Sequence, residues 1–99
     1  LLDWRERMRA RRDLVVAGIN AIPGLSTPVP DGAFYCLVDA SPHMARFGDD
    51  SALALHLLDH GVAVVAASAF GGRDGFRISF ATDEARLEEA LRRIAAALA

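Results

Sequence analysis

Two short apolar segments in the C-terminal half of the chain constrain its fold more than any other feature. They occupy residues 61–71 and 76–81, with Gly72-Arg73-Asp74-Gly75 between them. Their length and composition predict two strands, at 62–65 and 75–81, that are joined by a loop. Side chains alternate between the two faces of a strand. Each strand must therefore present two surfaces of different chemistry.

The second of these strands carries one arginine, Arg77, among apolar and small residues. Alternation places Arg77 with Ser79 and Ala81 on one face. An always-charged side chain in an apolar strand is costly unless it is paired. A guanidinium can bind a carboxylate or phosphate through parallel hydrogen bonds. We therefore expect Arg77 to bind either an acidic residue of the protein or a ligand anion. The opposite face should enter the core, and its side chains are Phe76, Ile78 and Phe80.

The overall composition is that of one globular domain. The 99 residues are 53% hydrophobic and 24% charged, which excludes a disordered chain. No apolar run approaches the roughly 20 residues that span a bilayer, and no secretory signal is recognisable at the start. A net charge of −2 favours neither nucleic acid nor a membrane surface as a partner. The chain starts with Leu1 rather than Met, which leads us to expect a fragment.

The side chains available for covalent chemistry are few. The single cysteine, Cys36, cannot form an internal disulfide, which fits a reducing, cytoplasmic location. Its apolar neighbours indicate a small buried hydrophobe, with a reactive thiol as the alternative. All 11 basic residues are arginine, and there is no lysine. Without a lysine, these residues alone cannot form the Schiff base that pyridoxal phosphate enzymes require.

Periodicity and turn residues predict the remaining elements. Apolar residues at helical spacing predict helices over 1–20 and in the region after Thr82, the predicted cap of the last helix. A third helix is expected from Asp50 or Ser51 to about His60, with Gly61 as its C-terminal cap. The segment 23–32 should be extended with a turn at Asp31-Gly32, followed by a strand at 33–39 and a loop at 40–50.

This order of elements predicts an α+β fold class. The sheet should be small, mainly antiparallel and three-stranded, with three helices packed on one face. The helices should cover the face that carries Phe76. The Arg77 face should then remain uncovered by this chain, so that something else covers it.

The other polar residues give weaker indications. The three histidines, His43, His56 and His60, lack a pattern of cysteines or carboxylates that would complete a metal site, so no metal is expected. Arg73 is expected to be solvated in a tight turn. The pair Asp49-Asp50 is interpreted as a cap and a surface charge. No glycine-rich phosphate loop and no basic patch with interleaved aromatics is present, which argues against nucleic acid as a partner.

Several motifs together resemble a known family. The motifs are Ile22-Pro23-Gly24, Pro30 to Tyr35, Ser68-Ala69-Phe70-Gly71 and Phe76 to Ala81, and the similarity covers most of the chain. In order and spacing, they resemble the C-terminal small domain of class I/II aminotransferases, the fold-type-I, aspartate aminotransferase-like pyridoxal phosphate enzymes. In this family a proline and a glycine precede the serine that matches Ser68, whereas this chain has Ala66 and Ala67, so the resemblance does not imply the shape of that loop.

The resemblance implies roles for particular residues. Arg77 matches the arginine that binds the substrate α-carboxylate. Gly32 matches a position where backbone approaches the substrate entrance, with a plain turn glycine as the alternative. Phe70 is expected either to line the substrate pocket or to lie in the core. No catalytic, cofactor-binding or metal-binding residue is expected within residues 1–99.

The resemblance also implies partners. Residues 1–99 would be one domain of a transaminase that moves an amino group between an amino acid and a 2-oxo acid. The missing large domain would bind pyridoxal phosphate, and the full-length protein would be a homodimer. The fragment alone should be inactive. Two alternatives stay open: a stand-alone module that binds an anion or a protein, and the small domain of a related pyridoxal phosphate lyase, decarboxylase or regulator.

Overall fold

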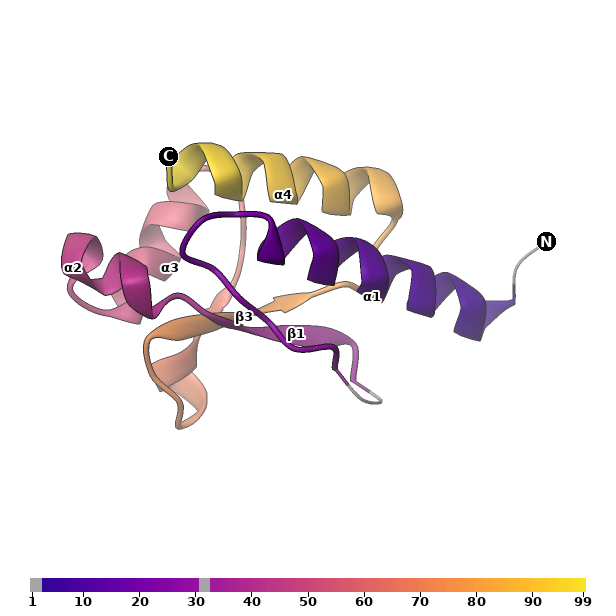
Figure 1. The fold of residues 1–99 in the computed structure, drawn as a ribbon, viewed down its shortest axis with the longest axis horizontal. Helices are drawn as coiled ribbons and strands as arrows, with labels where there is room; N and C mark the ends of the chain where they lie inside the picture. Colours follow the sequence, from indigo (N-terminus) through magenta and orange to yellow (C-terminus); the bar gives the residue numbers. More distant parts are fainter. Residues whose placement is uncertain (1–2, 31–32) are drawn as a thin grey trace.

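The computed structural model describes residues 3–30 and 33–99. It confirms a small α+β domain with a three-stranded antiparallel sheet in the order β1-β3-β2. Helices α1 and α4 lie side by side over the sheet, and α2 and α3 lie near one end (Figure 1). The helices and strands are α1 (Trp4–Asn20), β1 (Tyr35–Asp39), α2 (Met44–Phe47), α3 (Asp50–Asp59), β2 (Val65–Ala66), β3 (Gly75–Ser79) and α4 (Glu84–Ala97), with 3-10 turns η1 (Ser41–His43) and η2 (Ala67–Phe70).

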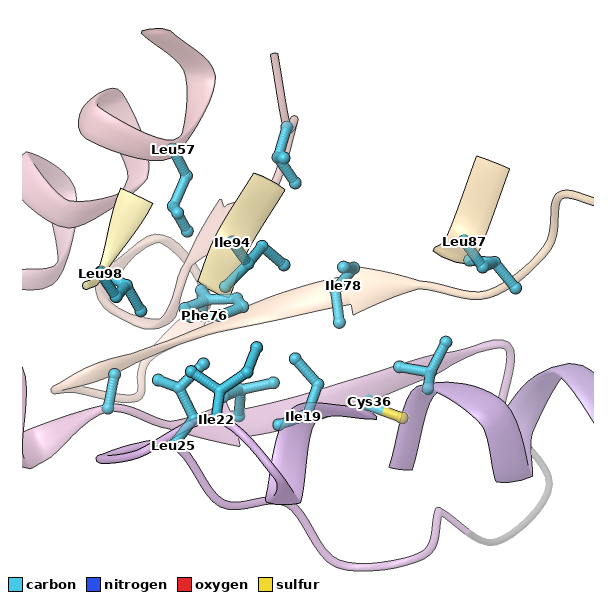
Figure 2. Packing of buried hydrophobic residues seen from close by; sticks show 14 of the residues in the cluster. Ile19, Ile22, Leu25, Cys36, Leu57, Phe76, Ile78, Leu87, Ile94 and Leu98 are labelled. Carbon is cyan, nitrogen blue, oxygen red and sulfur yellow. The ribbon is translucent and has the colours of Figure 1, made fainter. Parts of the chain in front are cut away.

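The inner face of the sheet carries the core. Phe76, Ile78 and Phe80 are all buried, as the alternation predicted. All three long helices contribute to the same cluster of buried side chains, so they cover the same face of the sheet. Figure 2 shows Phe76 below Ile94 of α4, with Leu57 of α3 nearby. The buried side chains of the central strand β3 therefore share one hydrophobic core with those of every long helix.

The helix boundaries differ from prediction at two N-termini. Asp49, not Asp50 or Ser51, caps α3, and its side chain accepts a hydrogen bond from the Ala52 amide at 2.8 Å. Asp83, not Thr82, caps α4. Each start offers adjacent residues that can cap, and the residue with extended backbone and a side chain directed at the N3 amide does so. The end of α3 is as predicted, because Gly61 has φ +83° after its last turn.

The segment predicted to be extended over 23–32 starts instead with a turn at Pro23-Gly24, where Gly24 has φ +84°, and it pairs with β1 only after this turn. Ser26 forms an antiparallel bridge with Asp39 through hydrogen bonds of 3.0 and 2.8 Å. The side-chain amide of Asn20 binds the backbone of Thr27 in both directions, at 2.9 and 3.0 Å. These bonds hold the segment beside β1. The predicted turn at Asp31-Gly32 lies outside the described residues.

Two predictions about the connections are wrong. The expected loop at 40–50 contains η1 and α2, because Pro42 near the start of η1 suits a first helical turn and Gly48, with φ +88°, ends α2. The expected strand at 62–65 contributes only β2 at its end. Val62 instead enters the core, with 4% of its surface exposed, and its amide closes the end of α3 by binding the Leu57 carbonyl at 2.9 Å.

Cys36 lies on the inner face of β1 and is fully buried, which confirms its predicted role as a small hydrophobe. Burial raises the pKa of the Cys36 thiol above its ordinary value. The folded protein therefore keeps the thiol proton at a pH where the unfolded chain, with an ordinary thiol pKa of about 8.5, has lost it. The resulting stabilisation is complete below that pH and is lost as the pH rises.

We therefore expect the free energy of unfolding to fall as the pH rises above about 8.5. Replacing Cys36 with Ala should reduce the slope of this decline, although it also lowers stability at neutral pH. Urea unfolding at several pH values measures both effects. If the free energy of unfolding fell with pH equally steeply in the wild-type and variant proteins, the buried Cys36 thiol would not be the cause of the decline.

Candidate functional site

Arg77 lies at the centre of the sheet, on the face turned away from the core. It is paired with Leu37 of β1 and Val65 of β2. Its side chain is half-buried. Alternation from the buried residues of β1 places Tyr35 and Leu37 on this side as well, where 37% and 50% of their surfaces are exposed. We call Tyr35, Leu37, Val65 and Arg77 the outer face.

The contacts of Arg77 are with aromatic rings. Its Cζ lies 4.8 Å from the ring centroid of Tyr35 and 5.4 Å from that of Phe70. Within residues 3–30 and 33–99, no acidic side chain forms an ion pair with Arg77. Of the two expected partners, an acidic residue of the protein is therefore not found in this part of the chain. The edges of the guanidinium, which carry its N–H donors, are available to an anion.

Phe70 comes to this site from η2, not from the sheet. Phe70 is 42% exposed, so the expectation that it lies in the core is wrong. Arg73, in the hairpin after η2, is exposed as predicted. The prediction for Gly32 falls on a residue outside the described ranges. Of the three predicted site residues, the structure thus brings together Arg77 and Phe70, and it adds Tyr35, which was not among them.

Shallow hollows flank the outer face on two sides. One has a volume of about 240 Å³ and is lined in part by Leu37, Asp39 and Phe70. The other has a volume of about 190 Å³ and is lined in part by Pro28 and Tyr35. Arg77 lies in neither. The described residues would consequently contact a small anion on Arg77 from one side, and its other side would stay open.

Asp50 holds the η2 turn that carries Phe70, a role that was not predicted from the sequence. Its carboxylate is 3% exposed and accepts hydrogen bonds from the Ser68 hydroxyl at 2.6 Å and amide at 3.2 Å. It also accepts from the Gly75 amide at 3.4 Å. The carboxylate thus ties α3 to η2 and to the start of β3. The sequence does contain an indication of this role. The run Asp49-Asp50-Ser51 has more capping residues than one helix can use, so one of them is free to bind elsewhere.

Replacing Asp50 with Asn should lower the free energy of unfolding by about 1–3 kcal/mol. The amide nitrogen of Asn cannot accept a hydrogen bond, so a buried donor loses its partner. Asp49→Asn is the matched control, because Asn caps a helix as well as Asp does. Urea unfolding measures both changes. If the two variants lost the same free energy of unfolding, the Asp50 carboxylate would not act as a buried acceptor that differs from a helix cap.

The histidines make contacts within the fold. The Nε2 atom of His56 lies 2.8 Å from the Ala97 carbonyl oxygen, and the Nδ1 atom of His60 lies 2.9 Å from the His56 carbonyl oxygen. Within the described ranges, no three His, Cys, Asp or Glu side chains could together hold a metal ion. No helix in this part of the chain has the length and apolar character needed to cross a membrane.

Comparison with known proteins shows the enzyme class to which this fold belongs. The chain belongs to the family of aminotransferase class I and II, whose family model matches residues 2–94. The aspartate aminotransferase of Rhizobium meliloti strain 1021 is 51% identical across 98% of the chain. The aspartate/prephenate aminotransferase of Thermus thermophilus is 44% identical across 95%.

Solved structures have the same fold. The crystal structure of the Rhizobium meliloti aspartate aminotransferase matches 94% of the chain with a TM-score of 0.86 and 47% identity. The alanine aminotransferase of Pyrococcus furiosus matches 96% with a TM-score of 0.90 and 32% identity. The chain spans about a quarter of the length of these proteins: 26% and 23% of the two relatives and 25% and 24% of the two structures.

Proposed function

We propose that residues 1–99 are the C-terminal small domain of a pyridoxal phosphate-dependent aminotransferase, and that Arg77 binds the α-carboxylate of its substrate. The observation that carries this proposal is the position of Arg77. It is an arginine on a rigid central strand, on the face that the helices leave open, without an ion-pair partner among the described residues. Family membership supplies the reaction class.

The cofactor would belong to another part of the protein. The chain has no lysine, so it cannot form the Schiff base through which pyridoxal phosphate is held and used. These residues do not fit the cofactor, and we assign them no step of its chemistry. Their contribution is to bind and orient the substrate. Two parallel hydrogen bonds from a planar guanidinium fix the direction of a carboxylate as well as its position.

The open outer face supports a second component of the proposal. Several exposed apolar side chains surround Arg77, and the flanking hollows are shallow. A large cofactor-binding domain of the same protein would cover this face and exclude water from the bound carboxylate. The names of the relatives favour L-aspartate as the amino donor and a 2-oxo acid as the acceptor. We also expect the complete protein to be a homodimer.

The test is an assay of the complete protein that contains these residues. After addition of pyridoxal phosphate, it should convert L-aspartate and 2-oxoglutarate into the corresponding oxo acid and amino acid. The 99 residues alone should show neither this activity nor an absorption band from a bound cofactor. Release of ammonia or carbon dioxide without amino transfer would indicate a lyase or decarboxylase. Tight binding of an amino acid by residues 1–99 alone would favour a stand-alone binding module.

A further inference from the structure

The guanidinium of Arg77 contacts two aromatic rings that come from separate parts of the chain. Tyr35 lies on β1, where it pairs with Ser79, two positions from Arg77 on β3. Phe70 is the last residue of η2. Their ring centroids lie 4.8 and 5.4 Å from the Arg77 Cζ. Two independent elements thus place a ring against the same cation.

Burial does not explain the position of either ring. Tyr35 and Phe70 keep 37% and 42% of their surfaces exposed, whereas the core phenylalanine Phe76 keeps 1%. An aromatic ring attracts a guanidinium through its face. A guanidinium that is contacted by rings in this way retains its in-plane N–H groups for hydrogen bonds. The rings therefore restrict the side chain without occupying the donors that an anion needs.

The turn that carries Phe70 is itself held firmly. The buried carboxylate of Asp50 binds Ser68, two residues before Phe70, through both amide and hydroxyl. At the other end of the turn, Gly71 adopts φ +89° and the Gly72 amide binds the Ala67 carbonyl at 2.9 Å. The turn that carries the ring is thus anchored to α3 at one end and closed by a local hydrogen bond at the other.

Arginine has a long side chain whose rotamer freedom must be lost when it binds a ligand. We propose that Tyr35 and Phe70 are positioning residues, which hold the Arg77 guanidinium in the orientation that receives the substrate carboxylate before the substrate arrives. This inference rests on the function proposed above for Arg77. It adds that part of the affinity for the carboxylate is set by two side chains that do not touch the carboxylate through hydrogen bonds.

The test compares Phe70→Leu and Tyr35→Leu with the conservative variants Phe70→Tyr and Tyr35→Phe in the complete protein. Each leucine variant should raise KM for the amino donor by about two- to fivefold, with a smaller effect on kcat. The conservative variants keep a ring and should retain the wild-type KM. Phe47→Leu is the matched control, since Phe47 contacts Arg46 in the same way, with the Arg46 Cζ 4.9 Å from its ring centroid, and should leave KM unchanged.

A second measurement separates positioning from a general structural effect. In an Arg77→Gln background, Phe70→Leu and Tyr35→Leu should cause no further rise in KM, because there is no guanidinium to orient. The inference is overturned if the leucine variants match wild type, if the conservative variants are as impaired as the leucine variants, or if the effects persist without Arg77. If Arg77→Gln itself leaves kcat/KM unchanged, the proposed function fails, and this inference fails with it.

Discussion

Replacing Arg77 with Gln in the complete protein should lower kcat/KM for amino transfer on the order of 10²–10³-fold. Gln can donate hydrogen bonds to a carboxylate, but it carries no charge and lacks the planar fork. The carboxylate would then be desolvated without a matching cation. Steady-state kinetics with L-aspartate measure the loss. Arg77→Lys should recover only part of the activity, because it restores the charge but not the two parallel hydrogen bonds.

The Arg77 variant needs a control for the general loss of an arginine. Arg86 on α4 is suitable, since its side chain is 80% exposed and pairs only with Asp83 at 3.6 Å among the ion pairs of the described residues. Arg86→Gln should therefore leave kcat/KM within about twofold of wild type. The stability of the Arg77→Gln variant should change by only about 1 kcal/mol, as for a cation–π contact of a half-buried arginine. Equal activity of the Arg77→Gln variant and the wild-type protein would refute the assigned role.

Replacing Phe76 with Ala should lower the free energy of unfolding by about 3–5 kcal/mol. Phe76 is 1% exposed and belongs to the cluster that joins β3 to all three long helices. Domains of this size are stable by only about 5–15 kcal/mol, so the variant should be close to unfolding at 37 °C. Urea or thermal unfolding measures the loss, at roughly 4–8 °C in Tm for each kcal/mol.

Two comparisons show whether the loss comes from the cavity. Phe76→Leu retains most of the volume and should cost clearly less than Phe76→Ala. Leu58→Ala removes an apolar side chain from α3 that is 56% exposed, and should cost less than about 1 kcal/mol. A Phe76→Ala loss as small as that of Leu58→Ala would contradict the position of Phe76 at the centre of the core.

Local patterns in the sequence were sufficient for the main features of the fold. Alternation along β3 separated the buried face of Phe76 from the face of Arg77, because the period of a strand is a property of the backbone itself. Helical periodicity and the glycine at Gly61 fixed the three long helices and one of their ends. The sequence alone also shows that there is no lysine, so these residues cannot form a Schiff base with pyridoxal phosphate.

The surroundings of Arg77 depended on the tertiary structure. The bonds from Asp50 to Ser68 and Gly75 join residues 18 and 25 positions apart, and no local pattern predicts which of two adjacent aspartates turns inward. The buried carboxylate binds Ser68 in the same turn that brings Phe70 to the guanidinium. An arginine on a strand can be recognised from its neighbours in sequence, but the two rings that contact it come from separate elements and meet only when the chain folds.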